Sequence, residues 1–412
     1  MSFKITDICD INASNLSSKD RWQYINYLDT ANLNEGMISK LQKLVVGQDK
    51  IPSRAKRKVK RNDILISTVR PSQKHYGLLR NIQENMVVST GFAVLSAKEN
   101  IVNAEYLYRF LTQKNIIAYL QAIAETSTSA YPSITSSVIG NLDINLPPLE
   151  EQKAIAQILS TLDEKIEVNN QINKKLEEIA QAIFKHWFVD FEFPNENGEP
   201  YKSSGGEMVE SELGMIPKGW DIVNLSAIAD ILMGQSPKGT SYNEEGSGKV
   251  FYQGRTDFGD RFPIRRLFTT EPKKMAKTGD VLMSVRAPVG DINLAYEDCC
   301  IGRGLCSIRS KNGHSSYMYY LMLSLKKKLD IYNGVGTVFG SINKNALNNI
   351  IIVKPSDSVI EMFNKVAYNL DQQYLCLVKE NRRLSIIRDT LLPKLMSGEI
   401  RVSLDNEGEE AS

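Results

Sequence analysis

The sequence predicts an α+β protein made of two similar α/β domains in tandem, separated by two long antiparallel helices that form a coiled-coil spacer. Three observations predict this fold class. The chain repeats itself, each repeat begins with a mixed segment of short β-type runs, and each then continues as a long helix with a heptad-like apolar pattern. The length of 412 residues suits two or three domains, each able to bury its own core.

The internal repeat is an ordered series of matches between the two halves of the chain. Residues 62–71 reappear as residues 279–288, and residues 173–176 reappear as residues 381–384. Between them, residues 105–108 match 316–319 and residues 132–134 match 340–342. The offset changes only from 217 to 208 along the series, which excludes chance similarity. Two copies of one domain-plus-helix unit are therefore expected.

The elements of each copy follow from local patterns. Short β-type runs such as 63–69 and 280–286 alternate with Gly, Pro and Asn turn signals. The segment between the copies is rich in Pro, Gly, Ser, Asn and Glu, a composition that cannot bury a core and predicts a linker. The expected parts are a first α/β domain over 1–148, a first spacer helix over 149–191, a linker over 192–215, a second α/β domain over 216–355, a second spacer helix over 356–402 and an acidic tail over 403–412.

Each mixed domain is followed by a long helical pattern. Apolar residues recur every three or four positions over 155–187 and 359–391, with Ile172 and Ile179 in the first stripe. One such stripe would indicate an ordinary core helix, whereas two matched stripes favour mutual pairing. Pro393 is expected to end or bend the second helix. The residues expected to pair the helices are Ile155, Leu162, Ile166, Asn173, Leu176, Ile183, Phe363, Leu370, Leu377, Asn381, Leu384 and Leu391.

Charge and composition narrow the class of protein. The chain carries 50 Lys and Arg against 48 Asp and Glu, which excludes a uniformly basic polymer but not local basic patches. No run approaches the roughly 20 apolar residues of a membrane span, and no signal-peptide pattern is present. The five cysteines form no CxxC pair and the three histidines lie far apart. We therefore expect a cytoplasmic protein with no disulfide framework, cofactor or metal of its own.

Positive charge is concentrated in one segment of the first domain. Residues 49–61 hold seven Lys and Arg against one Asp, and at the offset of 217 three of these cations fall on three lysines of the second domain. A charge run alone would indicate a solvated face, but its recurrence in both copies favours contacts to nucleic-acid phosphates. The expected phosphate contacts are Lys50, Arg54, Lys56, Arg57, Lys58, Lys60, Arg61, Lys273, Lys274 and Lys277.

Base reading needs donors of fixed geometry, and the fork of Arg suits guanine best. Arg70 and Arg286 are expected at equivalent strand ends ahead of a proline, where a rigid strand would aim them. The loops that follow diverge between the copies, which fits either two domains that read different sequences or ordinary loop drift. Further candidates for DNA contacts are Lys74, Arg255, Arg265 and Arg266.

Signatures of catalysis are missing from the sequence. It has no GxxxxGK[ST] phosphate loop and no Asn-Pro-Pro-aromatic or Asp-Pro-Pro-aromatic motif of the kind that adenine methyltransferases use. Tripeptides 151–153 and 271–273 have the nuclease-like form ExK, but a chain with this many charged residues contains such tripeptides by chance. We therefore assign no catalytic residue.

Three segments carry a resemblance to a known family. They are Leu-Pro-Pro-Leu-Glu-Glu-Gln-Lys-Ala-Ile-Ala at 146–156, Glu-Leu-Gly-Met-Ile-Pro-Lys-Gly-Trp at 212–220 and Leu-Leu-Pro-Lys-Leu-Met-Ser-Gly-Glu-Ile at 391–400. Over essentially its full length, the chain resembles the specificity subunit of type I restriction–modification systems. It departs from the family pattern at the start of the second helix, which reads Lys-Pro-Ser-Asp at 354–357.

The resemblance implies two target recognition domains, each reading one half of a bipartite, interrupted site on double-stranded DNA. It also implies that the spacer helices dock two methyltransferase subunits and that restriction subunits join the assembly. S-adenosylmethionine, ATP and Mg would then serve adenine methylation and cleavage in those partners, while this chain is not an enzyme. Two alternatives remain from the residues: a coiled-coil scaffold without DNA specificity, and a self-contained DNA methyltransferase or nuclease.

Overall fold

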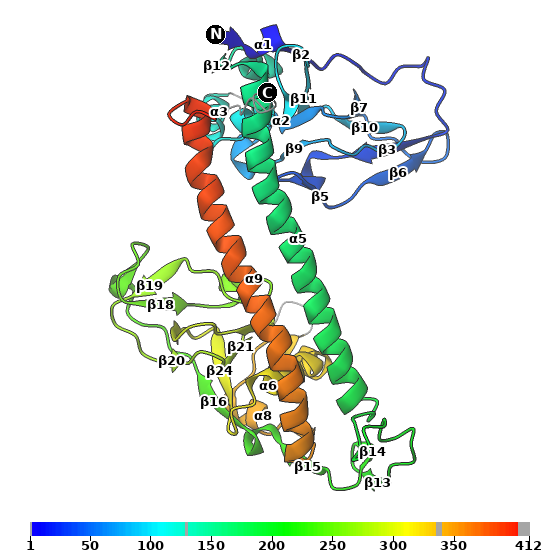
Figure 1. The fold of residues 1–412 in the computed structure, drawn as a ribbon, viewed down its shortest axis with the longest axis vertical. Coiled ribbons are helices and arrows are strands. Elements are labelled where there is room, and N and C mark those ends of the chain that lie inside the picture. The colour runs from blue at the N-terminus through cyan, green and yellow to red at the C-terminus, as the bar shows by residue number, and fades with distance from the viewer. Residues whose placement is uncertain (1, 128–130, 335–339, 403–412) are drawn as a thin grey trace, which may run out of the picture. The chain divides into compact units, whose positions relative to one another are not determined.

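The computed structural model describes residues 2–127, 131–334 and 340–402, so the expected acidic tail lies outside the described residues. The chain forms two compact units: Met1–Val168 with Glu380–Ser412, called unit 1, and Asn169–Lys379, called unit 2. Two long helices, α5 (Leu149–Phe188) and α9 (Asp357–Ser397), each contribute one half to either unit. Each unit therefore contains one α/β domain and a stretch of both helices (Figure 1).

The domain of unit 1 is built on two four-stranded sheets. The first is antiparallel and has the order β2 (Cys9–Ile11), β11 (Phe92–Ala97), β8 (Ile64–Ser67), β9 (Tyr76–Leu78). The second has the order β6 (Gln42–Val45), β3 (Tyr24–Leu28), β10 (Met86–Ser89), β7 (Ala55–Lys58), and its β3–β10 pair is parallel. The smaller pairs are β1 (Ser2–Lys4) with β12 (Asp143–Asn145) and β4 (Leu33–Asn34) with β5 (Met37–Ile38). The helices are α1 (Ile5–Ile8), α2 (Ala104–Leu111), α3 (Lys114–Glu125) and α4 (Ser136–Gly140).

The domain of unit 2 has corresponding sheets. The antiparallel sheet has the order β16 (Ala229–Met233), β24 (Leu305–Ser310), β21 (Val281–Ser284), β22 (Ile292–Leu294). The other has the order β17 (Tyr242–Asn243), β19 (Leu267–Thr269), β18 (Lys249–Tyr252), β23 (Cys299–Ile301), β20 (Met275–Ala276), with a parallel β18–β23 pair. The smaller pairs are β15 (Asp221–Asn224) with β25 (Ile351–Lys354) and β13 (Met208–Ser211) with β14 (Gly214–Pro217). The helices are α6 (Ser315–Ser324), α7 (Lys326–Leu329) and α8 (Lys344–Asn348).

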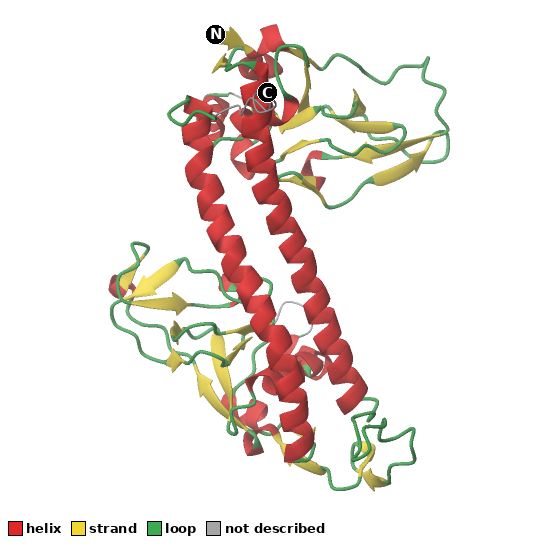
Figure 2. Ribbon diagram, viewed as in Figure 1, coloured by secondary structure: helices red, strands yellow, loops and turns green. Residues whose placement is uncertain are grey.

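The two domains share one topology, which confirms the tandem repeat. The order β2-β11-β8-β9 corresponds to β16-β24-β21-β22, and a single parallel pair joins the second sheet in each domain. Strand β8 consists of four buried residues and β21 likewise, as expected for a central strand covered on both faces. Among the described residues, Figure 2 shows the strands in the domains and in the β13–β14 hairpin, whereas α5 and α9 are helical throughout.

Each domain closes its core against the long helices of its own unit. In unit 1, Ile155 and Leu159 of α5 and Leu395 of α9 are buried in the same cluster as the apolar residues of α2, β8 and β11. In unit 2, Phe184 of α5 and Phe363 of α9 are buried with the residues of α6 and β21. The helices are thus part of the domain cores as well as a spacer.

Within each unit, α5 and α9 run antiparallel. In unit 1, Nη1 of Arg388 lies 2.7 Å from Oδ1 of Asp163, and Nδ2 of Asn381 donates to the carbonyl of Ile166 at 3.4 Å. Of the residues expected to pair the helices, Ile155, Ile183, Phe363, Leu370 and Leu391 belong to the domain cores, Asn173 is buried, and Leu162, Ile166, Leu176, Leu377, Asn381 and Leu384 are half-buried.

The apolar stripe of α5 is wider than the surface it buries. Ile172 and Ile179, which belong to the apolar stripe but not to the expected pairing residues, are 41% and 47% exposed. A straight helix drifts by roughly 20° per heptad relative to a strict seven-residue repeat, which turns some members of a stripe out of the seam. Pro393 lies inside α9 rather than at its end, and the helix continues to Ser397, where Gly398 follows with a φ of 77°. None of the described helices has the length and apolar content needed to span a membrane.

The expected linker over 192–215 is folded, which corrects the sequence-based interpretation. Phe193 is 6% exposed, and its ring stacks on those of Tyr201 and Trp220 with centroids 4.6 and 5.0 Å apart. Strands β13 and β14 form a hairpin in the same region. The average composition of the segment is polar, but a few aromatic side chains are enough to dock it on Trp187 and Phe188 at the end of α5.

Candidate nucleic-acid interface

The same turn precedes the central strand in both domains. Asp63 accepts a hydrogen bond from the backbone N–H of Lys60 at 2.8 Å, and Asp280 accepts one from Lys277 at 2.8 Å. Both carboxylates are buried. Burial raises the pKa of Asp63, although the hydrogen bonds from Ser96 and Lys60 act in the opposite direction and lower it. The offset of 217 therefore places Lys60 and Lys277 at the same point of the same turn.

The basic segment of unit 1 runs through a loop into β7, which is an edge strand. Five of its cations are exposed and form no ion pair with any described carboxylate: Lys50, Arg54, Lys56, Lys60 and Arg61. Asp49 is used locally, because its Oδ2 accepts from the backbone N–H of Val45 at 2.7 Å. This part of the segment presents uncompensated positive charge to the solvent.

Two cations of the same segment face the domain instead. Arg57 is half-buried, its Nη1 has no hydrogen-bond partner among the described residues, and burial lowers its pKa. Nζ of Lys58 lies 2.8 Å from Oδ1 of Asp20, and the hydrogen bond from Lys58 lowers the pKa of that carboxyl. Lys58 also lies over the ring of Trp22 at 5.7 Å. The sequence grouped these two with the exposed cations because an extended run of charge does not reveal which members a β-strand turns inward.

Most cations predicted in unit 2 already have a carboxylate partner. Arg255 pairs with Asp291 at 2.8 Å, Arg265 holds both oxygens of Glu297 at 2.6 Å, and Arg266 pairs with Asp257. Lys277 pairs with Asp298 at 2.7 Å. A guanidinium in a bidentate pair cannot present its fork to a base without first breaking that pair. Lys273 and Arg286 are exposed and Lys274 is half-buried, and none of the three forms an ion pair within the described part of the chain.

The two arginines expected at equivalent strand ends differ by one position in register. Val69 bridges to Ser133 and Arg286 bridges to Ser341, so Arg286 corresponds to Val69. In agreement, the N–H of Arg70 donates to the carbonyl of Pro132 at 2.9 Å, and Ala287 donates to Gly340 at 3.1 Å. The expected equivalence of Arg70 and Arg286 is therefore wrong. The proline that follows both strands suggested it, but Pro71 corresponds to Pro288, two residues beyond Arg286.

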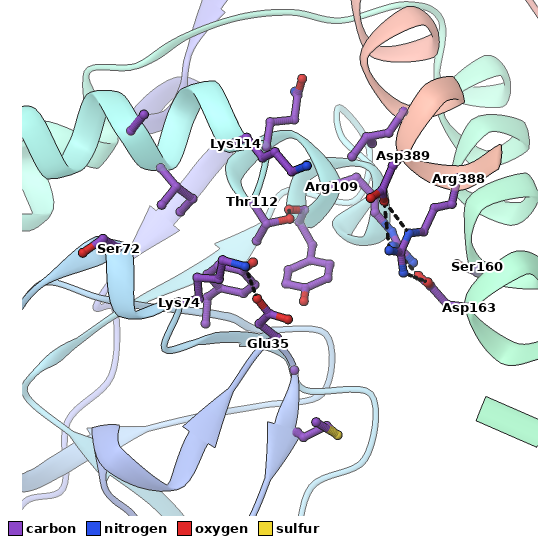
Figure 3. Close-up of a pocket in the computed structure, with 18 of the residues that line it drawn as sticks. Glu35, Ser72, Lys74, Arg109, Thr112, Lys114, Ser160, Asp163, Arg388 and Asp389 are labelled. Carbon is purple, nitrogen blue, oxygen red and sulfur yellow. Dashed lines mark hydrogen bonds and ion pairs between the residues drawn. The ribbon is translucent and has the colours of Figure 1, made fainter. Parts of the chain in front are cut away.

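The surroundings of Arg70 are distinctive. Its φ of 48° lies in the left-handed region, and its guanidinium lies 4.8 Å from the ring centroid of the exposed Tyr131. Cation–π stacking orients the flat guanidinium while its edge keeps donors free. Lys74, by contrast, forms an ion pair with Glu35, which raises the pKa of Lys74, and lines a cavity of about 1200 Å³ in unit 1 (Figure 3).

The described residues hold no cluster of three or more His, Cys, Asp or Glu side chains that could bind a metal ion. Burial raises the pKa of the Cys9 and Cys306 thiols to about 12, which suits structural rather than nucleophilic cysteines. A buried charge cluster in unit 2 has a structural role: Arg261, 3% exposed, contacts Glu177 of α5 and Asp371 of α9. Sequence reasoning missed this cluster, although the offset of 208 does align Asp371 with Asp163.

A protein-family model described as the type I restriction modification DNA specificity domain matches residues 1–178 and 217–360. The chain belongs to this family. The two matched stretches fall on the two repeats, so the specificity-domain family accounts for both α/β domains and most of α5, while the match ends at residue 360, near the start of α9. The membership confirms the assignment to DNA specificity subunits rather than to enzymes or plain coiled-coil scaffolds.

Relatives of the specificity family are similar over most of the chain. The HindI specificity subunit of Haemophilus influenzae is 30% identical and the match covers 85% of this chain and 89% of that protein. The putative MjaX specificity subunit of Methanocaldococcus jannaschii is 32% identical, with 97% and 93% covered. The type I restriction–modification S subunit of M. genitalium superposes with a TM-score of 0.59 at 18% identity, covering 96% of each chain, which supports the fold.

Proposed function

We propose that this chain supplies DNA sequence choice to a type I restriction–modification assembly, and that each domain reads one half of a bipartite, interrupted site. The observation that carries the proposal is the repeated turn held by Asp63 and Asp280. In a member of a DNA specificity family, this turn presents Lys60 and Lys277 from equivalent points of two domains with the same topology. A scaffold without DNA affinity would not need a cation at both places.

The roles of the candidate residues follow from their surroundings. The exposed cations Lys50, Arg54, Lys56, Lys60 and Arg61, which have no ion-pair partner within the described part of the chain, suit contacts to phosphate, which supply affinity without sequence choice. Arg70, stacked on Tyr131, and Arg286, exposed after β21, suit contacts to base edges. In unit 2, the paired cations Arg255, Arg265, Arg266 and Lys277 must exchange a carboxylate for a phosphate, so they contribute less affinity.

The chemistry belongs to partner subunits. Two methyltransferase subunits would dock on the spacer helices, and restriction subunits would join the assembly in the cytoplasm. S-adenosylmethionine, ATP and Mg would bind those partners, and this chain would choose the adenine they modify. The half-exposed apolar residues of α5, such as Ile172 and Ile179, are available for such docking.

A gel-shift titration of the full-length chain at two salt concentrations tests the proposal. The triple variant Lys56→Gln, Lys60→Gln, Arg61→Gln should weaken binding to all duplexes alike and reduce the slope of log K against log salt by about 0.9 for each lost phosphate contact. Lys153→Gln, Lys175→Gln, Lys185→Gln on α5 is the control, since it removes the same charge from exposed spacer lysines. Absence of DNA binding by the wild-type chain, or equal loss in both triple variants, would refute the proposal.

A further inference from the structure

Asp163 of α5 and Asp371 of α9 occupy the same position of the two repeats, because the offset that aligns Asn173 with Asn381 also aligns these carboxylates. Each lies where a long helix meets the domain of its own unit. We propose that Asp163 and Asp371 are positioning residues, which fix each recognition domain on the spacer and so set the distance at which the two half-sites are read. This inference rests on the proposed function.

In unit 1, Asp163 joins two arginines from different elements (Figure 3). One of its oxygens pairs with Arg109 of α2, and the other lies 2.7 Å from Nη1 of Arg388 of α9. The side chain of Arg109 is only 10% exposed, and its Nη2 lies 3.0 Å from Oε1 of Glu105. Because α2 packs on β9 and β11, the carboxylate connects the sheet that carries Arg70 to the spacer.

In unit 2, Asp371 is 8% exposed and gathers three donors. The hydroxyl of Tyr320 donates to Oδ1 at 2.9 Å, that of Ser316 donates to Oδ2 at 2.5 Å, and Nη2 of Arg261 lies 2.5 Å from Oδ1. Tyr320 and Ser316 belong to α6, which packs on β21, the strand that leads to Arg286. The base-reading candidate of this domain is thus connected to the spacer through the same kind of carboxylate contact.

The acceptor is the same in both copies, whereas the donors differ. Residues 105–108 align with 316–319, so Arg109 corresponds to Tyr320 and Glu105 to Ser316. An ionised carboxylate has about four acceptor sites and takes Arg, Tyr or Ser donors alike. One docking residue on the helix can therefore hold domains whose own residues have diverged. The side chain of Asp371 is buried and that of Asp163 is 31% exposed. In both places a charge-assisted hydrogen bond is short and directional, so it restricts the position of the domain on its helix.

To test this, the full-length wild-type chain and the variants Asp163→Asn and Asp371→Asn each select binding sites from a pool of duplexes with a randomised core. The sites that each variant selects are then compared with those of the wild type. The variants should keep the bases chosen in each half-site but accept spacers that differ by about one base pair or more. Their affinity for the best wild-type site should fall about tenfold or more, as expected for the loss of a charge-assisted hydrogen bond. Glu164→Gln and Glu361→Gln, exposed carboxylates on the same helices, serve as controls and should change neither property.

Tyr320→Phe provides a milder variant, since it removes one donor to Asp371 and keeps the packing of the ring. It should broaden the spacer distribution in the same direction but by less, while its circular dichroism stays that of the wild type. Folded variants with the wild-type spacer distribution would overturn the inference. A wild-type chain that selects no sequence at all would instead refute the proposed function, so the two failures are distinguishable.

Discussion

Nη2 of Arg261 lies 2.5 Å from Oδ1 of Asp371, and both side chains are buried between the second domain and α9. The guanidinium also lies over the rings of Tyr319 and Tyr374, at 4.4 and 4.8 Å. A charge in such a place depends on its partners, because it has lost most of its contact with water.

Removal of Arg261 should therefore destabilise unit 2 strongly. We expect Arg261→Ala to lower the free energy of unfolding by about 3–5 kcal/mol, since it leaves the carboxylate of Asp371 buried without its cation. Arg265→Ala, which removes a half-exposed partner of Glu297, should cost only about 0–1 kcal/mol. Denaturant unfolding of the full-length chain measures both, and equal losses in the two variants would contradict the prediction.

The aromatic cluster of Phe193 predicts a second result. Phe193→Ala should make segment 192–215 sensitive to protease, because it removes the ring that stacks on Tyr201 of the same segment and on Trp220 outside it. Limited proteolysis followed by mass spectrometry locates the cut. Val189→Ala, at an exposed position in the same region, should leave the segment resistant. Rapid cleavage of the wild-type segment would show that the cluster does not hold it.

Thiol reactivity reports on burial. Burial raises the pKa of Cys9 and Cys306 to about 12, so at pH 8 almost none of either is the reactive thiolate. Iodoacetamide should label the exposed Cys376 of the native chain and leave the four buried cysteines unlabelled. The unfolded chain should react at all five. Native Cys376→Ser should take up no label. Labelling of Cys9 at the rate of Cys376 would be inconsistent with the fold of unit 1.

Arg286 should control base choice in one half-site only. Arg286→Ala is expected to relax discrimination there by about 1–3 kcal/mol, and Arg286→Lys should not restore it, because Lys lacks the fork that meets guanine. Site selection with the full-length chain measures the preference at each position. A change in both half-sites, or in neither, would show that Arg286 reads no base.

Sequence patterns were sufficient for the repeat, for the strands at 63–69 and 280–286 and for the two long helices, because these depend on local periodicity. They were insufficient wherever long-range contacts decide. Arg265 pairs with Glu297, which lies in the connection between β22 and β23, more than 30 residues along the chain. The sequence alone therefore gives no sign that this cation has a carboxylate partner. The one-residue difference between Arg70 and Arg286, by contrast, could have been read from the sequence, because the match of residues 62–71 to 279–288 aligns Val69 with Arg286, as the bridges to Ser133 and Ser341 also do.

Unit 1 is discontinuous along the chain, whereas unit 2 is the single segment Asn169–Lys379. During synthesis the first domain therefore emerges first but waits for Leu391 and Leu395, which complete its apolar core. At roughly 5–20 residues per second, the roughly 200 residues in between impose a delay on the order of 10–40 s. A ribosome that stops after residue 379 releases a complete second domain beside a first domain whose core is open to solvent, which makes the interrupted product a target for chaperones and proteases.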